Sequence, residues 1–283
     1  MKKRALAVLA AAFAATMSLS AFAGDDNTII IAATPTPHGE ILEQAKPLLE
    51  EQGYKLDIQI FEDYIIPNNV VESGEMDANY FQHVLYLNDF NAQNGTHLVN
   101  AGGVHYEPFG VYGGEKKSLD ELEDGDKIAV PNDPTNEARA LLLLEENGVL
   151  TLKEGVGLEA TKLDVESYAK DIELVEVEAA QVPHILNEVS FAVMNGNYAL
   201  EAGFSASKDA IALETADSDA ISQYVNVIAV KEGNENSEKI QALLSVLTSD
   251  TIKEFIDGEY DGSVVAYTPA EEAVEETTEA ITE

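Results

Sequence analysis

Arg139 is the residue of this 283-residue chain whose side chain is best suited to bind a charged ligand. It lies in the stretch VPNDPTNEARALLLLEENG, residues 130–148, and apart from Arg4 every other basic residue is a lysine. A guanidinium presents a fixed fork of donors that matches a carboxylate in two parallel hydrogen bonds, which lysine cannot reproduce. Arg139 is therefore a candidate carboxylate ligand. The alternative is a surface arginine paired with Glu137 or Glu145.

The residues before Arg139 favour a position at the mouth of a cleft. Asp133 can cap a helix whose first residue is Pro134, and this start places Arg139 in the second turn. The apolar run 127–131 before it is a predicted strand. The arginine then faces the carboxyl end of that strand, where the helix N-terminus already favours negative charge.

Three further stretches place polar or aromatic side chains at predicted strand ends. Phe81 and His83 could form the wall of an apolar pocket, although Phe81 could equally be a core residue. Asn195 could accept a hydrogen bond from an ammonium and donate one to a carboxylate, and Gly196 would let a ligand approach the backbone. Asn226 lies in an otherwise apolar strand, and because a buried amide needs partners it is either a structural bridge or a ligand contact.

The sequence lacks the parts of most enzyme mechanisms. It contains no cysteine, and no GxGxxG, P-loop, GxSxG or HExxH motif, so we expect a protein that is not an enzyme and needs no cofactor. None of its histidines pairs with another at a helical spacing, and we expect no metal site. A metal-binding receptor remains an alternative, which would need His38, His83 and His105 to converge. The five histidines are His38, His83, His97, His105 and His184.

Composition and charge separate the two ends of the chain from its body. Residues 1–23 have a basic start, an apolar run and the ending Ala21-Phe22-Ala23, which predicts a secretory signal peptide cleaved near Ala23. Without the signal, 16 − 3 = 13 basic residues face 52 acidic ones, so nucleic acid and anionic membranes are poor candidate partners. Residues 269–283 are acidic and poor in large apolar side chains, and we expect them to be a disordered tail.

Between these ends, apolar strands alternate with amphipathic helices, which predicts α/β structure with parallel sheets covered on both faces. Residues 104–112 and 224–231 are predicted strands, and 107–112 and 224–231 are long enough to cross between two lobes. We expect one lobe from 28–110 plus 226–268 and a second from 111–225. The cleft between the lobes is then the expected ligand site. Helices are predicted over 70–76 and 179–188, among others.

Seven segments together resemble the methionine-binding lipoproteins of ABC importers, the MetQ/NlpA family. The resemblance covers residues 28–268, in family order and spacing. It implies a two-lobed periplasmic-binding-protein fold that closes on methionine and delivers it to a membrane permease. The segments are ATPTPHGEILEQAKPLLEEQGY, FEDYIIPNN, GEMDANYFQH, VHYEPFGVY, VPNDPTNEARALLLL, EAAQVPHIL and NGNYALEAG.

The resemblance also implies roles for individual residues. Arg139 would hold the α-carboxylate of the ligand, and Asn195 and Asn226 would bind its backbone groups. The side-chain pocket would be lined by Tyr64, Phe81 and His83. Of these six, periodicity alone gives no reason to choose Tyr64.

Two features depart from the family. Ala21-Phe22-Ala23-Gly24 stands where the family carries a lipobox cysteine, so we expect a periplasmic, secreted or cell-surface monomer that is not lipid-anchored there. The acidic tail is also unusual and leaves a surface adhesin or antigen as a third reading. Within the receptor class, a methionine-containing dipeptide or another apolar amino acid is the alternative ligand, since one methylene is worth only about 1–3 kcal/mol.

Overall fold

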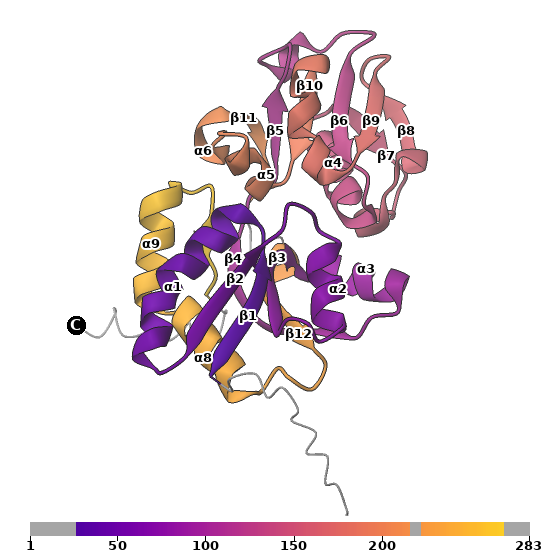
Figure 1. The fold of residues 1–283 in the computed structure, drawn as a ribbon. Coiled ribbons are helices and arrows are strands. Elements are labelled where there is room, and N and C mark those ends of the chain that lie inside the picture. The colour runs from indigo at the N-terminus through magenta and orange to yellow at the C-terminus, as the bar shows by residue number, and fades with distance from the viewer. Residues whose placement is uncertain (1–26, 216–221, 269–283) are drawn as a thin grey trace, which may run out of the picture.

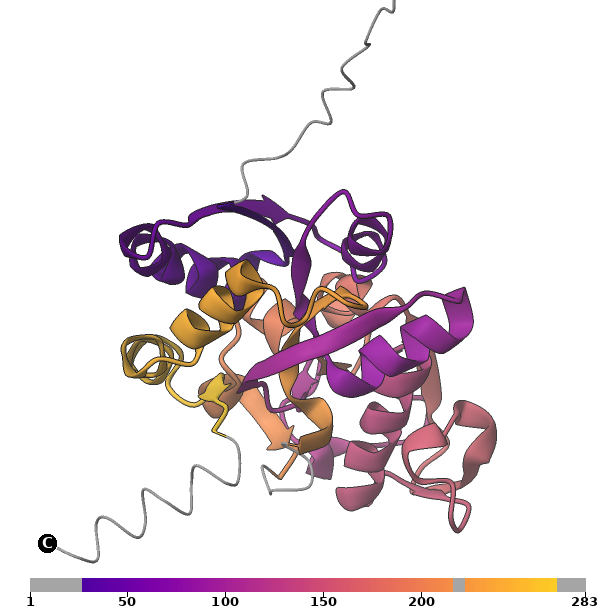
Figure 2. The same ribbon diagram turned by 90° about the horizontal axis from the view of Figure 1, so that it is seen from below.

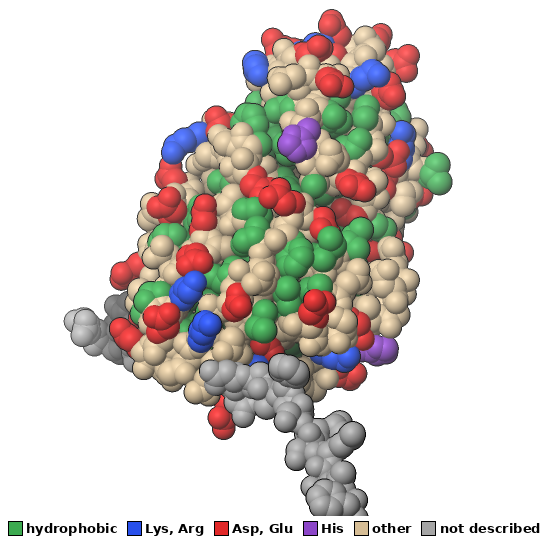
Figure 3. All heavy atoms as spheres, in the orientation of Figure 1, with side chains coloured by type: hydrophobic (Ala, Val, Ile, Leu, Met, Phe, Trp, Pro, Cys, Tyr) green, Lys and Arg blue, Asp and Glu red, His purple; other side chains and the backbone are tan. Residues whose placement is uncertain are grey.

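Two α/β lobes make up the computed structural model, which describes residues 27–215 and 222–268 (Figure 1). The expected signal peptide, 1–23, and the expected tail, 269–283, lie outside these residues. Within them, no helix combines the length and the apolar character that a membrane span requires. Figure 3 shows acidic side chains over both lobes and few basic ones, as the net charge of −36 requires.

The first lobe is built on a six-stranded sheet in the order β13-β4-β12-β3-β1-β2. Strand β1 pairs in parallel with β2 and β3, but β12 is antiparallel to both β3 and β4. The expectation of a parallel sheet is therefore wrong for its centre, because β12 enters the sheet from the second lobe. The strands are β1 (Thr28–Ala33), β2 (Lys55–Ile60), β3 (Ala78–His83), β4 (Leu98–Tyr106), β12 (Asn226–Lys231) and β13 (Val265–Ala266).

Helices cover both faces of this sheet. Helices α1 (Glu40–Glu51), α8 (Glu238–Leu247) and α9 (Asp250–Tyr260) pack on one another and bury the larger apolar cluster against the strands. Helices α2 (Ile66–Glu72) and α3 (Val84–Asn94) enclose a smaller cluster with β12. In Figure 2 the yellow-orange C-terminal helices and the magenta α3 lie on opposite sides of β4.

The second lobe contains a five-stranded sheet in the order β11-β5-β10-β6-β9. Strand β6 is parallel to β9 and β10, whereas β5 is antiparallel to β10 and β11, so this sheet is also mixed. The helix α4 (Pro134–Glu146) covers one face, and β7 and β8 form a separate hairpin pair beside it. The remaining elements are β5 (Gly110–Gly113), β6 (Lys127–Pro131), β7 (Leu150–Leu152), β8 (Val165–Tyr168), β9 (Glu173–Val177), β10 (Phe191–Met194), α5 (Gly196–Glu201), α6 (Ala206–Asp209) and β11 (Ala210–Leu213).

Three predicted elements differ from those observed. The strand expected over 104–112 ends at Tyr106 and resumes at Gly110, because the chain leaves one sheet for the other there and Pro108 has no N–H for a ladder. The helix expected over 179–188 is two 3₁₀ turns, Ala179–Gln181 and Pro183–Glu188, divided by a proline.

The helix expected over 70–76 is α2, which begins and ends earlier in the chain. Its start is set by Asp63, whose Oδ1 accepts from the backbone N–H groups of Ile65 and Ile66, each at 2.7 Å. An aspartate that satisfies the free donors of a first turn marks a helix start, and this signal overrides the apolar periodicity further along.

Candidate functional site

A small cavity lies where the two lobes meet. All six residues expected at the site line it. Strand ends, loops and one helix turn supply them, the arrangement that α/β sheets favour for ligands. The lining residues are Tyr64, Phe81, Gln82, His83, Tyr86, Glu107, Asn136, Arg139, Asn195, Gly196, Asn197 and Asn226.

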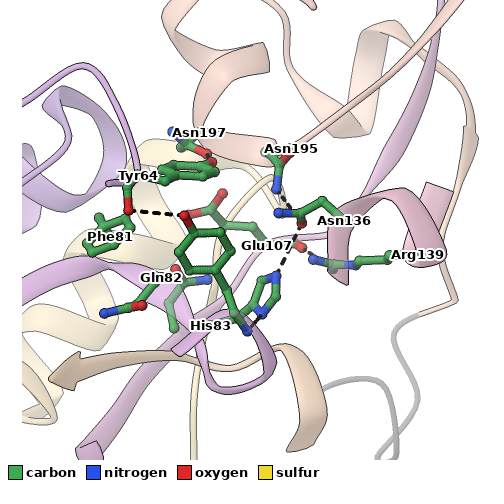
Figure 4. A pocket seen from close by; sticks show the side chains of 12 residues that line it. Tyr64, Phe81, Gln82, His83, Glu107, Asn136, Arg139, Asn195 and Asn197 are labelled. Carbon is green, nitrogen blue, oxygen red and sulfur yellow. Dashed lines mark hydrogen bonds between the residues drawn. The ribbon is translucent and has the colours of Figure 1, made fainter. Parts of the chain in front are cut away.

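Figure 4 shows how these side chains surround one space. Tyr64, Phe81 and Gln82 lie on one side, and Asn136, Asn195 and Arg139 on the other, with Glu107 between the two groups. The antiparallel register of β12 explains part of the convergence: Asn226 lies opposite both His83 on β3 and His105 on β4. Residues far apart in the chain therefore meet where the neighbouring strands β3, β4 and β12 end or begin.

Arg139 is buried, with 4% of its surface exposed, so the interpretation as a surface arginine is wrong. Its Nε and Nη2 donate to the two carboxylate oxygens of Glu214, and Nη2 also donates to the backbone oxygen of Glu107 at 2.9 Å. The guanidinium lies 3.9 Å from the ring centre of Tyr224. Burial lowers the pKa of Arg139, but the charge of Glu214, its hydrogen bonds to the guanidinium and the nearby Tyr106 and Tyr224 together outweigh burial and raise it.

This pairing determines which nitrogen atoms of Arg139 can bind a ligand. The Nε/Nη2 edge, the one that forms two parallel bonds with a carboxylate, is used by Glu214. Nη1 is the amine that neither Glu214 nor the backbone oxygen of Glu107 uses. Glu214 thus orients the guanidinium and was not a residue that the sequence pointed to, because it lies 75 positions away.

His83 is buried and neutral. Its Nδ1 accepts from the backbone N–H of Tyr86, and its Nε2 donates to Asn136 Oδ1 at 3.2 Å. Burial, with the nearby Arg139 charge, lowers the pKa of His83 to about 3. A neutral imidazole whose two nitrogens are both hydrogen-bonded can line the cavity without adding charge to it.

Two asparagine side chains in the cavity carry buried polar atoms that lack a hydrogen-bond partner among the described residues: Asn195 Oδ1 and Asn197 Nδ2. The other ends of the amides are engaged, since Asn195 Nδ2 donates to Asn136 Oδ1 at 2.8 Å and Asn197 Oδ1 accepts from Tyr64. Buried polar groups are normally paired, so this one acceptor and one donor are exceptions among the residues that line the cavity.

Aromatic rings form the apolar wall. Tyr64 stacks on Tyr198 with ring centres 4.8 Å apart and lies 5.5 Å from Phe81 and Tyr86. Phe81 lines the cavity and also packs in a buried cluster with Tyr86 and Phe90, so both interpretations of Phe81 apply. Flat apolar faces of this kind suit a flexible, polarizable thioether side chain.

Glu107 is a second charged residue that sequence reasoning missed. It is 5% exposed and accepts from His105 Nε2 at 2.7 Å, while His38 Nε2 lies 3.5 Å from the same oxygen. A signal was available: His105 and Glu107 alternate along one strand and so share a face. Burial raises the pKa of Glu107. The hydrogen bond from His105, the electrostatic interaction with His38 and His105, and the hydrogen bond from the backbone of Asn197 together outweigh burial and lower the pKa.

The other oxygen of Glu107 lies against Gly196. A Cβ at position 196 would come within 2.7 Å of Glu107 Oε2 and 2.8 Å of Glu107 Cβ. The glycine predicted to let a ligand approach the backbone is therefore needed for the close approach of this glutamate.

The structure changes the set of residues that could hold a metal ion. His38, His105 and Glu107 have ligand atoms within 4.8 Å of one another, and this is the group in the described ranges that could hold a metal ion. His83 is not part of it, so the expected set of three histidines is wrong. In this arrangement His38 Nε2 donates to Asn226 Oδ1 at 3.1 Å and His105 Nε2 donates to Glu107 Oε1 at 2.7 Å, so the side chains of the group are already hydrogen-bonded.

Comparison with known proteins shows a clear relationship. The model of the NlpA lipoprotein family matches residues 29–268. The methionine-binding lipoprotein MetQ of Bacillus subtilis (strain 168) is 40% identical over 276 residues, which cover 94% of this chain and 98% of that protein. A lipoprotein structure from Ruminococcus gnavus ATCC 29149 has a TM-score of 0.84 and 62% identity, covering 86% of this chain and 100% of that one. A nutrient-binding protein from Burkholderia cenocepacia, solved bound to methionine, has a TM-score of 0.81 and 40% identity, covering 85% and 100%.

Proposed function

Because this chain belongs to the NlpA lipoprotein family, we propose that it is a substrate-binding receptor that captures methionine and delivers it to an ABC importer. It acts as a receptor and not as an enzyme, and it needs no cofactor. The observation that carries the proposal is the pair of unpartnered amide atoms, Asn195 Oδ1 and Asn197 Nδ2, in a cavity that also holds Arg139 and an aromatic wall.

Each part of an amino acid has a matching part of the cavity. Arg139, through Nη1, holds the ligand's α-carboxylate, and Asn195 and Asn226 bind its backbone polar groups. Tyr64, Phe81 and His83 line the pocket for the thioether side chain. The mixture of a few placed polar groups with an apolar wall is the usual composition of a small-molecule site.

The lobes divide at the two connections between the sheets. We assign 28–110 plus 226–268 to the first lobe and 111–225 to the second, which places one sheet in each. Both lobes line the cavity, so a ligand bound there is contacted from two sides. The receptor works as a monomer that presents its closed form to the membrane permease.

The site of action is extracytoplasmic. Relatives of this chain are named lipoproteins, whereas its 283 residues contain no cysteine. We propose that the receptor works in the periplasm, outside the cell or at the cell surface.

Calorimetry on ligand-free protein tests the function. The mature chain is unfolded and refolded to remove any bound ligand, then titrated with L-methionine, with D-methionine and Gly-Met as comparisons. Saturable one-to-one binding of L-methionine is expected. Absence of binding to all three compounds would refute the methionine assignment and leave the fold with a different ligand.

A further inference from the structure

Strand β3 changes its side-chain alternation where it reaches the cavity. The consecutive residues Phe81 and Gln82 both line the cavity, whereas successive side chains of a regular strand point to opposite faces of the sheet. The pairing with β12 shows the reason, because Val227 lies opposite Gln82 and Ile228 lies opposite Tyr80. Between them, Phe81 has no partner among the described residues of β12. Phe81 is therefore the extra residue of a β-bulge, a feature that changes the direction of a side chain.

Three buried amides, those of Asn68, Asn79 and Gln82, form a hydrogen-bonded ring beside this bulge. Asn68 Nδ2, in the first turn of α2, donates to Gln82 Oε1 at 3.0 Å, and Gln82 Nε2 donates back to Asn68 Oδ1 at 2.6 Å. Asn79 Nδ2 donates to the same Asn68 oxygen at 2.9 Å, and Asn79 Oδ1 accepts from Gln82 Nε2 at 2.8 Å. The three residues are at most 2% exposed. We call them the amide ring.

The amide ring and the bulge depend on each other. Asn79 and Gln82 are three positions apart on β3, so they would lie on opposite faces of a regular strand and their amides could not meet. Tyr80 packs in the larger apolar cluster with residues of α1 and α8, and without the bulge Gln82 would point to that face. An amide buried in apolar surroundings is costly. The partners that Gln82 finds in the amide ring therefore favour the bulged register.

We propose that the amide ring positions the side-chain pocket: it directs Phe81 towards the thioether of the ligand and fixes the turn that carries Tyr64. The inference rests on the proposed function and adds residues that set its preference for a methionine side chain. The ring centres of Phe81 and Tyr64 are 5.5 Å apart, and both lie on the same side of the cavity as Gln82 (Figure 4).

The link from the amide ring to Tyr64 runs through α2. Asn79 Nδ2 also donates to the backbone oxygen of Pro67 at 3.2 Å, so both Pro67 and Asn68 in the first turn of this helix are held against β3. Tyr64 lies just before that turn. Asn68 and Asn79 are outside the cavity lining, and they are therefore positioning residues that act through Phe81 and Tyr64.

A purely structural role would give a different result from a positioning role. If the amide ring only stabilised the fold, its loss would weaken the binding of every ligand by the same factor, because unfolded protein binds none of them. If it positions Phe81 and Tyr64, its loss changes the ratio of affinities for ligands that differ only in their side chains. The ratio is therefore the quantity to measure.

The test measures the preference for L-methionine over L-2-aminobutyrate, which has the same backbone groups and lacks the thioether end. Competition calorimetry gives both dissociation constants. Wild type should prefer L-methionine by at least about tenfold, because one methylene-sized group in an apolar pocket is worth about that much. Asn68→Leu keeps the branching of the side chain and removes its amide. In this variant the preference should fall at least about threefold, the effect expected when a side chain is turned about 30° from its preferred conformation.

Asn91→Leu is the matched control. Asn91 lies in α3 of the same lobe, outside the cavity lining, and its amide also makes three hydrogen bonds, with Thr96 and Leu98. This variant should be less stable in urea than wild type and should keep the wild-type preference. An equal fall of the preference in Asn91→Leu would overturn the proposal, because the effect would then follow from the loss of any buried amide.

Asn79→Ala keeps the proposal testable if Asn68→Leu folds poorly, because both hydrogen bonds between Asn68 and Gln82 remain. Its preference should fall in the same direction. A preference that changes by less than about threefold in whichever of the two variants folds would overturn the proposal. If wild type binds no L-methionine, the proposed function itself fails.

Discussion

Replacing Arg139 separates its role in binding from its role in the fold. In Arg139→Met the ligand carboxylate loses its charged donor, which should weaken L-methionine binding by about 2–5 kcal/mol. An independent figure agrees: two unit charges about 4 Å apart attract by about 4 kcal/mol at an effective dielectric of about 20. The dissociation constant should therefore rise by about 30- to 4,000-fold.

The same change should also destabilise the protein, because Glu214 is left buried without its partner. Its side chain is 14% exposed and its two oxygens accept from Arg139 Nε and Nη2. Breaking a buried pair from one side costs about 3–5 kcal/mol. A loss of affinity in Arg139→Met alone could therefore come from unfolding.

A double variant resolves this ambiguity. Arg139→Met with Glu214→Gln leaves no unpaired charge, so the free energy of unfolding in urea should recover most of the loss. Its affinity for L-methionine by calorimetry should remain as weak as that of the single variant, since the donor to the ligand is still absent. If both variants bind L-methionine within about threefold of wild type, Arg139 is not a ligand residue and the assignment is refuted.

Two further predictions follow from the contacts of the cavity. Tyr64→Phe keeps the ring stacked on Tyr198 but removes the hydrogen bond to Asn197 Oδ1, so affinity for L-methionine should fall by about 1 kcal/mol; an unchanged value in calorimetry would show that this bond does not order the site. Burial lowers the pKa of His38 to about 4 and that of His83 to about 3. Because the unfolded chain protonates these groups near pH 6.5 and the folded chain does not, stability should fall as the pH drops from about 6.5 towards 4. Urea unfolding at pH 7 and pH 5 measures this, and equal or greater stability at pH 5 would contradict the assigned neutral state.

The fold class, and the position of five of the six expected residues at the cavity, could be read from the sequence because the signals are local. Apolar runs mark buried strands, and Asp133 with Pro134 marks the start of α4, where Asp133 Oδ1 indeed accepts from the backbone N–H of Asn136. Because α4 starts at this point, Arg139 lies early in the helix, where its side chain reaches the strand ends. Tyr64 came from family resemblance alone, since it lies in a turn before α2 where no periodicity applies.

What the sequence could not give are the partners contributed by distant elements. Glu214 meets Arg139 across 75 positions, and His38 meets Asn226 across 188. The antiparallel insertion of β12 between β3 and β4 was hidden for the same reason: an apolar strand buried on both faces reads alike in either direction. The partners of Arg139 and Asn226 depend on these long-range pairs, so they became visible only in the structure.

The site also couples ligand binding to the arrangement of the lobes. Several hydrogen bonds cross directly between the first and second lobes near the cavity, and three of them are those from Tyr64 to Asn197 Oδ1, from His83 to Asn136 Oδ1, and from Tyr198 to the backbone oxygen of Glu62. All three would break if the lobes separated. Asn195 and Asn197 belong to the second lobe, and the rings of Tyr64 and Phe81 belong to the first. A ligand that contacts both groups therefore binds the closed arrangement more tightly. Because a ligand shifts an equilibrium by its difference in affinity for the two states, methionine itself would stabilise the form in which the lobes meet.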